Sequence, residues 1–277
     1  MSPDVLLDDE DLAITWLPGR GARLVVSFTG IGHRKTGFAE TETVQQIEFP
    51  KIASQEGDNH VAFVTDRTRT WYNTPGQIER IETALRALAA RVGARQIVTL
   101  GNSMGAYGAI LFANRIGAAR AIAFAPQFTM DDRLVRDRRW QDLKRHIPRH
   151  AVPSLAGAMV GPCRFFVLHG GRGEDGRHWR RFPTGPNIQH YVLPLKTHAV
   201  AVQLRHAGKL PGLIDALFAE DTETVIRSMS AENGYLRGGS GWPAALHGWA
   251  ASQSTRLGHR SARWLVEQVV GPAPVST

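Results

Sequence analysis

Residues 96–109 run Gln96-Ile97-Val98-Thr99-Leu100-Gly101-Asn102-Ser103-Met104-Gly105-Ala106-Tyr107-Gly108-Ala109, and this stretch decides the fold. Its first five residues include three aliphatic side chains and predict a short strand, whereas the residues after Gly105 predict a buried helix. A serine on a tight turn between a strand and a helix is typical of a nucleophile elbow. The glycines two positions before and after the serine fit this turn, because the backbone is strained and the neighbouring chain passes too close for a Cβ. The pattern predicts that Ser103 is a nucleophile.

The size and composition of the chain indicate one large α/β domain of a globular protein. It has 277 residues, of which 43% are hydrophobic. No apolar run approaches the roughly 20 residues that span a bilayer, so no membrane span is expected. The acidic stretch from Met1 to Asp11 lacks the basic and apolar regions of a signal peptide. Cys163 is the single cysteine and can form no internal disulfide, so we expect a cytoplasmic location.

The formal net charge of +8 raises the question of an anionic partner. The basic residues are spread along the chain, and no helix-turn-helix, zinc-finger or RNA-recognition motif is present, so no nucleic-acid partner is expected. This charge is either a solvated basic face or a surface for an anionic substrate. The densest basic cluster comprises Arg133, Arg136, Arg138, Arg139, Lys144, Arg145 and Arg149.

Seven strand-like runs alternate with helical or loop segments, which favours a mostly parallel sheet of about seven strands with helices on both faces. The first two runs flank the turn signal Pro18-Gly19-Arg20-Gly21 and are expected to pair as an antiparallel hairpin. An amphipathic helix is predicted from about Pro75 to Val92. The runs are 12–17, 23–29, 60–65, 96–100, 119–125, 164–169 and 188–193.

These runs predict a core over residues 1–220 with a short helical lid at about 126–162. The lid segment carries the basic cluster and is interrupted by prolines. Residues 221–277 are expected to form a C-terminal helical extension packed on the core, with a final helix over 261–270. The extension could also cover the edge of the site or exchange between the subunits of a homodimer.

A serine nucleophile needs a base that takes its proton and a carboxylate that orients the base. Asp175 follows the sixth predicted strand, and His198 follows the seventh. Parallel strands place their carboxyl ends at one edge of a sheet, so both loops should open beside Ser103. We predict Asp175 as the acid and His198 as the base, with Glu174 as the alternative acid.

Other residues fit these roles less well. Asp66, after the third strand, and Asp131 or Asp132, after the fifth, are topologically possible acids. His178 is the next candidate base. The remaining histidines of this region are expected inside a strand, at the opposite edge of the sheet and in a helix; they are His169, His190 and His206.

Acyl transfer also needs hydrogen-bond donors aimed at the developing oxyanion. One predicted donor is the backbone N–H of Met104. The second comes from the loop after strand 23–29, at Gly30 or Ile31, although this loop could also be a plain turn. The candidate substrate contacts are His33 and Arg34, which follow this loop and suit an anion, and Trp71 and Tyr72.

Through the serine turn and the later Asp175 and His198, the chain resembles the α/β-hydrolase superfamily. The resemblance covers roughly residues 12–220. Within this superfamily, the chain resembles a bacterial subgroup associated with polysaccharide or surface-glycan biosynthesis, through the elbow and two further patterns. These are Asp66 followed by Trp71-Tyr72-Asn73, and Asp175-x-x-His178 followed by His198. The resemblance implies a nucleophile at Ser103, an acid at Asp175 and a base at His198, with neither a metal nor an organic cofactor. The oxyanion loop departs from that of many esterases, because Thr29-Gly30 replaces a His-Gly pair.

The predicted triad is compatible with two enzymatic functions. A serine hydrolase of the esterase or thioesterase type would use Ser103 to form an acyl-enzyme that water hydrolyses. An acyltransferase would pass the same acyl group to a glycan hydroxyl, and no sequence feature separates the two. A third hypothesis is a non-catalytic hydrolase-like scaffold that binds a glycan or a protein partner. The expected substrate is a small-molecule or glycan ester, which would be anionic if the basic cluster contacts it.

Overall fold

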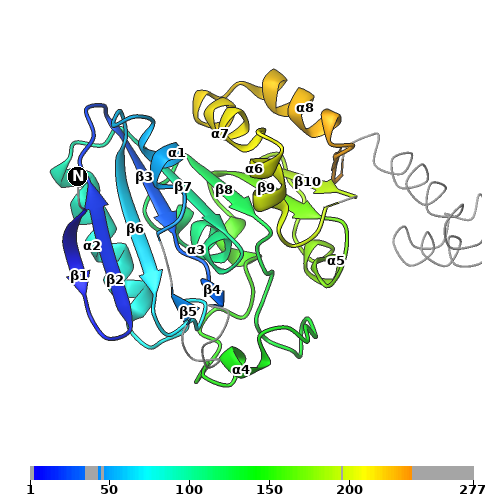
Figure 1. Ribbon diagram of the computed structural model, residues 1–277. Helices are drawn as coiled ribbons and strands as arrows, with labels where there is room; N and C mark the ends of the chain where they lie inside the picture. The colour runs from blue at the N-terminus through cyan, green and yellow to red at the C-terminus, as the bar shows by residue number, and fades with distance from the viewer. Residues whose placement is uncertain (1–2, 35–42, 45–46, 195, 239–277) are drawn as a thin grey trace, which may run out of the picture.

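A nine-stranded, largely parallel sheet lies at the centre of the computed structural model, which describes residues 3–34, 43–44, 47–194 and 196–238 (Figure 1). Its strand order is β1-β2-β6-β3-β7-β8-β9-β10-β11. The strands are β1 (Asp4–Asp8), β2 (Leu12–Leu17), β3 (Arg23–Phe28), β6 (His60–Asp66), β7 (Gln96–Asn102), β8 (Arg120–Phe124), β9 (Arg164–Gly170), β10 (Ile188–Leu193) and β11 (Tyr235–Leu236). A separate antiparallel pair comprises β4 (His33–Arg34) and β5 (Thr43–Val44).

The α/β class and the seven predicted strands are confirmed, and the sheet gains one edge strand on each side. The six adjacent strands β6, β3, β7, β8, β9 and β10 are parallel to one another, and β2 pairs antiparallel with β6. The added strands pair antiparallel, β1 with β2 and β11 with β10. These edges escape sequence patterning because β1 is acidic and largely exposed, while β11 is only two residues long.

The predicted hairpin between residues 12–17 and 23–29 is wrong, because β6 lies between β2 and β3. The turn that joins these two strands instead contacts the chain at the start of β6. The Gly19 N–H donates to His60 Nδ1 at 2.9 Å, and the Gly21 N–H donates to the Asp58 carbonyl at 2.7 Å. A turn motif indicates that the chain changes direction, but it does not indicate whether the two flanking strands pair with each other.

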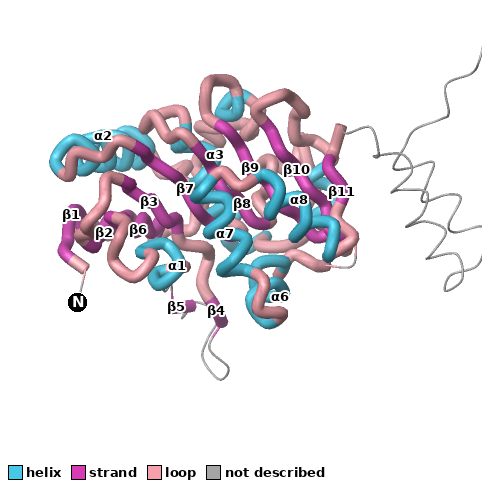
Figure 2. Tube along the Cα trace, turned by 90° about the horizontal axis from the view of Figure 1, so that it is seen from above, coloured by secondary structure: helices cyan, strands magenta, loops and turns pink. Residues whose placement is uncertain are grey.

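Helices cover both faces of the sheet (Figure 2). One face packs against α2 (Gln77–Arg91) and α3 (Met104–Ala113), and the predicted helix at 75–92 corresponds to α2. Alternate side chains of each strand enter two separate cores, so Leu24 and Val26 of β3 face α2 and α3, whereas Val25 lies in the opposite core. The opposite face packs against α1 (Pro50–Ser54), α6 (Val200–His206), α7 (Leu210–Ala219) and α8 (Thr222–Ala231).

The segment 126–162 extends beyond the carboxyl ends of the central strands and then returns along α3 to the start of β9 (Figure 1). Its helical parts are α4 (Gln141–Lys144) and a 3₁₀ turn (Gly157–Met159), so it is more loop than helix. At the same end of the sheet, α5 (Asp175–Trp179) follows β9. These two elements place side chains next to the turn that carries Ser103.

The described part of the C-terminal extension contributes α8 and β11, so the sheet continues past residue 220. The predicted helix over 261–270 and the homodimer exchange fall outside the described residues. Within the described ranges, the longest helix has 15 residues, and no helix is both long enough and apolar enough to cross a bilayer.

Candidate active site

Ser103 occupies a strained turn between β7 and α3, with φ at 56° and ψ at −120°. The turn has no room for side chains at its glycines. A Cβ on Gly101 would lie 2.2 Å from the Gly105 carbonyl oxygen, and a Cβ on Gly105 would lie 2.1 Å from the Phe28 carbonyl oxygen of β3. The Ser103 N–H donates to the Phe124 carbonyl at 2.8 Å, which ties the turn to the end of β8. The local sequence therefore holds the serine at the carboxyl edge of the sheet.

Three side chains from separate loops meet beside this turn. The Ser103 Oγ lies 2.9 Å from His198 Nε2, and His198 Nδ1 lies 2.9 and 3.0 Å from the two carboxylate oxygens of Asp175. Asp175 is the first residue of α5, and His198 follows β10. The parallel strands thus bring a hydroxyl, an imidazole and a carboxylate into one hydrogen-bonded line.

Neighbouring hydrogen bonds define where the protons of this line lie. Because an ionised carboxylate only accepts, His198 Nδ1 carries the proton and Nε2 accepts from the Ser103 hydroxyl. The Ser103 Oγ itself accepts from the Gln127 amide nitrogen at 3.3 Å. Gln127 is held by the indole N–H of Trp71, which donates to Gln127 Oε1 at 2.8 Å. Sequence reasoning missed Gln127, because a single glutamine after a strand carries no motif.

Asp175 is ionised although it is almost fully buried. Burial alone would raise the pKa of its carboxyl group, but the hydrogen bonds from His198 and the positive charge of Arg139 outweigh burial and lower that pKa. Arg139 Nη1 donates to Asp175 Oδ1 at 2.8 Å. Arg139 was predicted only as part of the basic cluster, and its contact with Asp175 had no sequence signal.

The other predicted acids have different partners. The fully buried Asp66 accepts from the backbone N–H groups of Thr68, Thr70 and Tyr72, so its carboxylate organises the loop after β6. The remaining candidates form ion pairs within their own segments, namely Glu174 with Arg177, Asp131 with Arg133 and Asp132 with Lys144.

Among the described residues, the other histidines of this region form no hydrogen bond with Ser103. His178 is buried, and its Nε2 lies 2.8 Å from Asp137 Oδ2. His169 and His190 are buried together, with 2.8 Å between His169 Nδ1 and His190 Nε2. His206 is exposed at the end of α6.

The predicted oxyanion donors lie on the two chain segments that flank the serine. Met104 is the first residue of α3, where backbone N–H groups have no partner within the helix. Gly30 follows β3, and its N–H donates to Glu48 Oε1 at 3.2 Å. Burial raises the pKa of Glu48 to about 7, and the bond from Gly30 opposes this only in part. The Gly30 donor is thus shared with a carboxyl group that titrates near neutral pH. Ile31 follows directly and contacts Arg69 through its carbonyl.

The predicted substrate contacts have different surroundings. Tyr72 is fully buried and packs edge-on against Phe28, so it belongs to the core and offers no surface to a ligand in this structure. Trp71 is also buried, and it borders the site through Gln127. His33 and Arg34 form β4, but the positions of their side chains lie outside the described part of the chain.

Aspartates neutralise much of the basic cluster in the segment 126–162. Arg136 and Arg138 are exposed, but four other cations of the cluster are paired within the segment. This mixture of charges gives no support to an anionic substrate. The pairs are Arg133 with Asp131, Arg139 with Asp137, Lys144 with Asp132 and Arg145 with Asp142.

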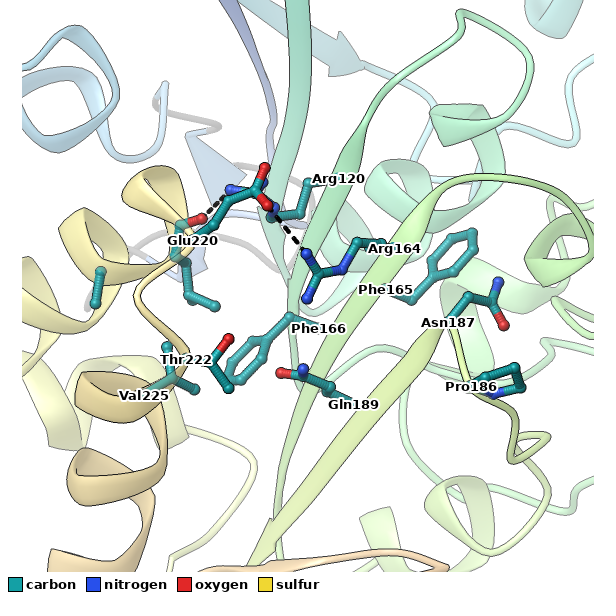
Figure 3. Close-up of a pocket in the computed structure, with 12 residues that line it drawn as sticks. Arg120, Arg164, Phe165, Phe166, Pro186, Asn187, Gln189, Glu220, Thr222 and Val225 are labelled. Carbon is teal, nitrogen blue, oxygen red and sulfur yellow. Dashed lines mark hydrogen bonds and ion pairs between the residues drawn. The ribbon is translucent and has the colours of Figure 1, made fainter.

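A small cavity of about 40 Å³ lies at the opposite end of the sheet (Figure 3). Arg120 and Arg164, the first residues of β8 and β9, border this cavity and both pair with Glu220. The length of the strands separates the cavity from Ser103. In the ranges that the structure describes, no three His, Cys, Asp or Glu side chains are grouped so that they could hold a metal ion.

Comparisons with known proteins identify the architecture through structure alone. No protein-family model matches the sequence, and no curated protein sequence matches it either. The capsule O-acetyltransferase of Neisseria meningitidis serogroup A superposes with a TM-score of 0.53 at 13% identity, over 74% of this chain and 92% of the other. Brefeldin A esterase, a bacterial homologue of human hormone-sensitive lipase, superposes with a TM-score of 0.54 at 17% identity, over 80% and 76%. The strand order, the serine turn and these likenesses show that the chain has the α/β-hydrolase fold.

Proposed function

We propose that this protein is a serine hydrolase of the esterase or thioesterase type. The observation that carries the proposal is the hydrogen-bonded line from Ser103 through His198 to Asp175, on a strained turn at the carboxyl edge of the sheet. A serine hydroxyl alone is a weak nucleophile, and an imidazole acceptor oriented by a carboxylate activates it.

The first half of the reaction forms an acyl-enzyme. Ser103 Oγ attacks the carbonyl carbon of the substrate, and its proton passes to His198 Nε2. Asp175 stabilises the imidazolium that results. The N–H of Met104 and a donor at Gly30 or Ile31 would bind the oxyanion. The bond to the leaving group then breaks, and His198 returns the proton to the departing alcohol or thiol.

The second half releases the acyl group. A water molecule gives a proton to His198 Nε2 and attacks the acyl carbon, and the bond to Ser103 Oγ breaks as the proton returns to that oxygen. The products are a carboxylic acid and the regenerated serine. The same steps with a glycan hydroxyl in place of water would yield a new ester.

This acyl transfer to a glycan is the second candidate function, and the likeness to a capsule O-acetyltransferase favours it. The two functions differ in the acceptor alone. Purified protein would be given p-nitrophenyl acetate with and without an oligosaccharide. An acetylated oligosaccharide, detected by mass spectrometry, would indicate transfer, whereas acetate as the only acyl product would indicate hydrolysis.

Labelling with a fluorophosphonate tests the proposed nucleophile. We expect one adduct, mapped to the peptide that contains Ser103, because the phosphonate traps an activated serine. His198→Ala should abolish labelling because the hydroxyl loses its base. His206→Ala, a change at an exposed histidine, is the matched control and should label like the unmodified protein. A folded protein that stays unlabelled while a control hydrolase reacts would favour the non-catalytic scaffold.

A further inference from the structure

Arg139 bridges two carboxylates, Asp137 and Asp175. Its Nε and Nη2 groups donate to Asp137 Oδ1 at 3.0 Å and to Oδ2 at 2.7 Å, which makes a planar fork. The remaining Nη1 group donates to Asp175 Oδ1 at 2.8 Å. That oxygen also accepts from His198 Nδ1, so a guanidinium and an imidazole meet on one carboxylate. The side chains of Asp137 and Asp175 are only 1% and 3% exposed, so solvent screens these contacts little.

A second set of contacts fixes Asp137 from the other side. His178 Nε2 donates to Asp137 Oδ2 at 2.8 Å, and His178 Nδ1 accepts from the backbone N–H of Phe128 at 3.1 Å. His178 lies three residues after Asp175 on α5, so both side chains lie on one face of that helix. These contacts form a closed ring. Asp175 of α5 accepts from Arg139, and His178 of α5 binds Asp137, which in turn accepts from Arg139.

The next residue of the same segment contacts the base. The ring centroids of Trp140 and His198 lie 5.3 Å apart, and the Arg139 guanidinium carbon lies 4.3 Å from the centre of the Trp140 ring. Stacking of a guanidinium on an indole restricts both groups. Two consecutive residues thus contact the acid and the base.

We propose that Arg139, held by Asp137, is a positioning residue of the triad: it aligns the Asp175 carboxylate and opposes positive charge on His198. This inference rests on the proposed function, because it assigns Arg139 a role at the same site. The guanidinium balances the buried carboxylate and repels an imidazolium, so it favours the form of His198 that accepts the serine proton. The other titratable groups that face Asp175 are His169 from β9, which burial keeps neutral, and His198 itself.

The segment contains a natural control for this arrangement. Asp131 and Arg133 repeat the Asp-x-Arg spacing of Asp137 and Arg139. Arg133 Nε and Nη2 donate to Asp131 at 3.0 and 2.7 Å, as in the other fork. The Arg133 side chain is 84% exposed, and among the described residues it forms no hydrogen bond or ion pair with the triad. Removing Arg133 therefore breaks an equivalent fork without touching the acid.

The test compares Arg139→Gln with Arg133→Gln in ester hydrolysis and in the rate of fluorophosphonate labelling. We expect Arg139→Gln to lower kcat/KM by roughly 10- to 100-fold, mainly through kcat, because the acid and base lose their alignment. Arg133→Gln should stay within about twofold of the unmodified protein. Arg139→Lys keeps the charge but loses the fork, so its rate should be intermediate.

The pH profile separates positioning from a general loss of structure. In Arg139→Gln, the imidazolium loses a repulsive neighbour, so the acidic limb of kcat/KM should move up by about 0.5–1 pH unit. The limb should not move in Arg139→Lys or in Arg133→Gln. A merely structural role for Arg139 would lower the rate of its variants and leave the limb in place.

NMR titration of the His198 imidazole gives a readout that needs no activity. In Arg139→Gln, the midpoint of the His198 titration should move to higher pH, as the acidic limb of kcat/KM does. A midpoint equal to that of the unmodified protein would overturn the inference. The inference would also be overturned if Arg139→Gln and Arg133→Gln had equal values of kcat/KM and the same acidic limb in their pH profiles. If the unmodified protein fails to label at Ser103, the proposed function fails, and the NMR comparison still decides whether Arg139 sets the charge of His198. Should Arg139→Gln fail to fold, Asp137→Asn is the second variant: it keeps the guanidinium and removes the carboxylate that offsets its charge, so the pH at which His198 titrates should move down, and an upward move would contradict the inference.

Discussion

Glu48 places a carboxyl group against the backbone N–H of Gly30, near Ser103. A Cβ on Gly30 would lie 2.8 Å from Glu48 Oε1 and 3.3 Å from the Asn102 carbonyl oxygen, so Gly30 contacts both Glu48 and the residue that precedes Ser103. The Ser27 hydroxyl donates to the Glu48 carbonyl at 2.7 Å and fixes this part of the backbone. An ionised Glu48 would compete with the oxyanion for the Gly30 N–H and would repel its charge.

This arrangement predicts a pH dependence. Because the pKa of Glu48 is about 7, the carboxyl group is neutral below that pH and negative above it. We expect kcat/KM for an ester to decline as pH rises through about 7. Glu48→Gln should remove the decline, because the amide keeps an acceptor for Gly30 but never becomes charged. Profiles measured from pH 5.5 to 9 check this, and the same decline in both proteins would contradict it.

Single residues differ in how far their positions could be predicted from the sequence. The structure brings together Ser103, Asp175 and His198, which were chosen from chain order and from the shared edge of parallel strands; their catalytic role stays a prediction. The contacts of Gln127 and Arg139 with this group could not be predicted. Both residues belong to an irregular segment, where no periodicity fixes the direction of a side chain.

At the scale of elements, the turn into α3 depends on a close approach between two backbones. The helix crosses β3 so closely that Gly105 has the Phe28 carbonyl where its Cβ would be. Gly212 of α7 offers a matched contrast, since a Cβ there meets nothing within 4 Å.

Replacing these two helical glycines by alanine should change the free energy of unfolding in opposite directions. Gly105→Ala must push α3 away from β3, and we expect it to lower the free energy of unfolding by about 2–4 kcal/mol. Gly212→Ala should raise it by about 0.5–1 kcal/mol, because alanine favours a helix. Urea unfolding followed by circular dichroism measures both changes. A Gly105→Ala protein as stable as the original would contradict the packing described here.

Regular elements were predictable and connections were not. The seven central strands and α2 follow from apolar runs and helical periodicity, since burial imposes those patterns. The position of β6 between β2 and β3 does not follow from local sequence, because strand order depends on contacts between distant segments. The segment 126–162 was expected to form a short helical lid, yet it is mostly loop and contains two carboxylate–guanidinium forks.

At the scale of the whole molecule, a chain of buried histidines joins four parts of the fold. Arg237, next to β11, donates to His190 Nδ1 at 2.9 Å, and His190 Nε2 lies 2.8 Å from His169 Nδ1. His169 Nε2 donates to the Pro126 carbonyl at 2.8 Å. With Arg237 as the donor, each histidine carries its proton on Nε2, so both are neutral.

Protonation of these histidines should destabilise the fold. Burial lowers the pKa of His169 to about 3 and the pKa of His190 well below its usual value. The unfolded chain binds these protons near pH 6.5 and the folded chain does not, so stability is full above that pH and is lost as pH falls below it. Between pH 7.5 and 5.5 we expect a loss of about 2–3 kcal/mol for the two groups together.

Urea unfolding at several pH values checks this expectation. In His190→Gln, the free energy of unfolding should lose about half of its pH dependence. In His206→Gln, a change at an exposed position, it should keep all of that dependence. A pH dependence that is unchanged in His190→Gln would show that other groups cause it. Both proteins should be compared at equal ionic strength, since the chain carries many surface ion pairs.

The order of strands in the sheet also bears on how the protein is made. Ser103 leaves the ribosome 95 residues before His198, and the strand that leads to His198 is flanked by β11, at Tyr235–Leu236. During translation, the serine turn can therefore form while its partners are still unsynthesised. For at least 95 residues of synthesis, a nascent chain would carry the serine without its base, so reactivity toward phosphonates should arise only late in translation.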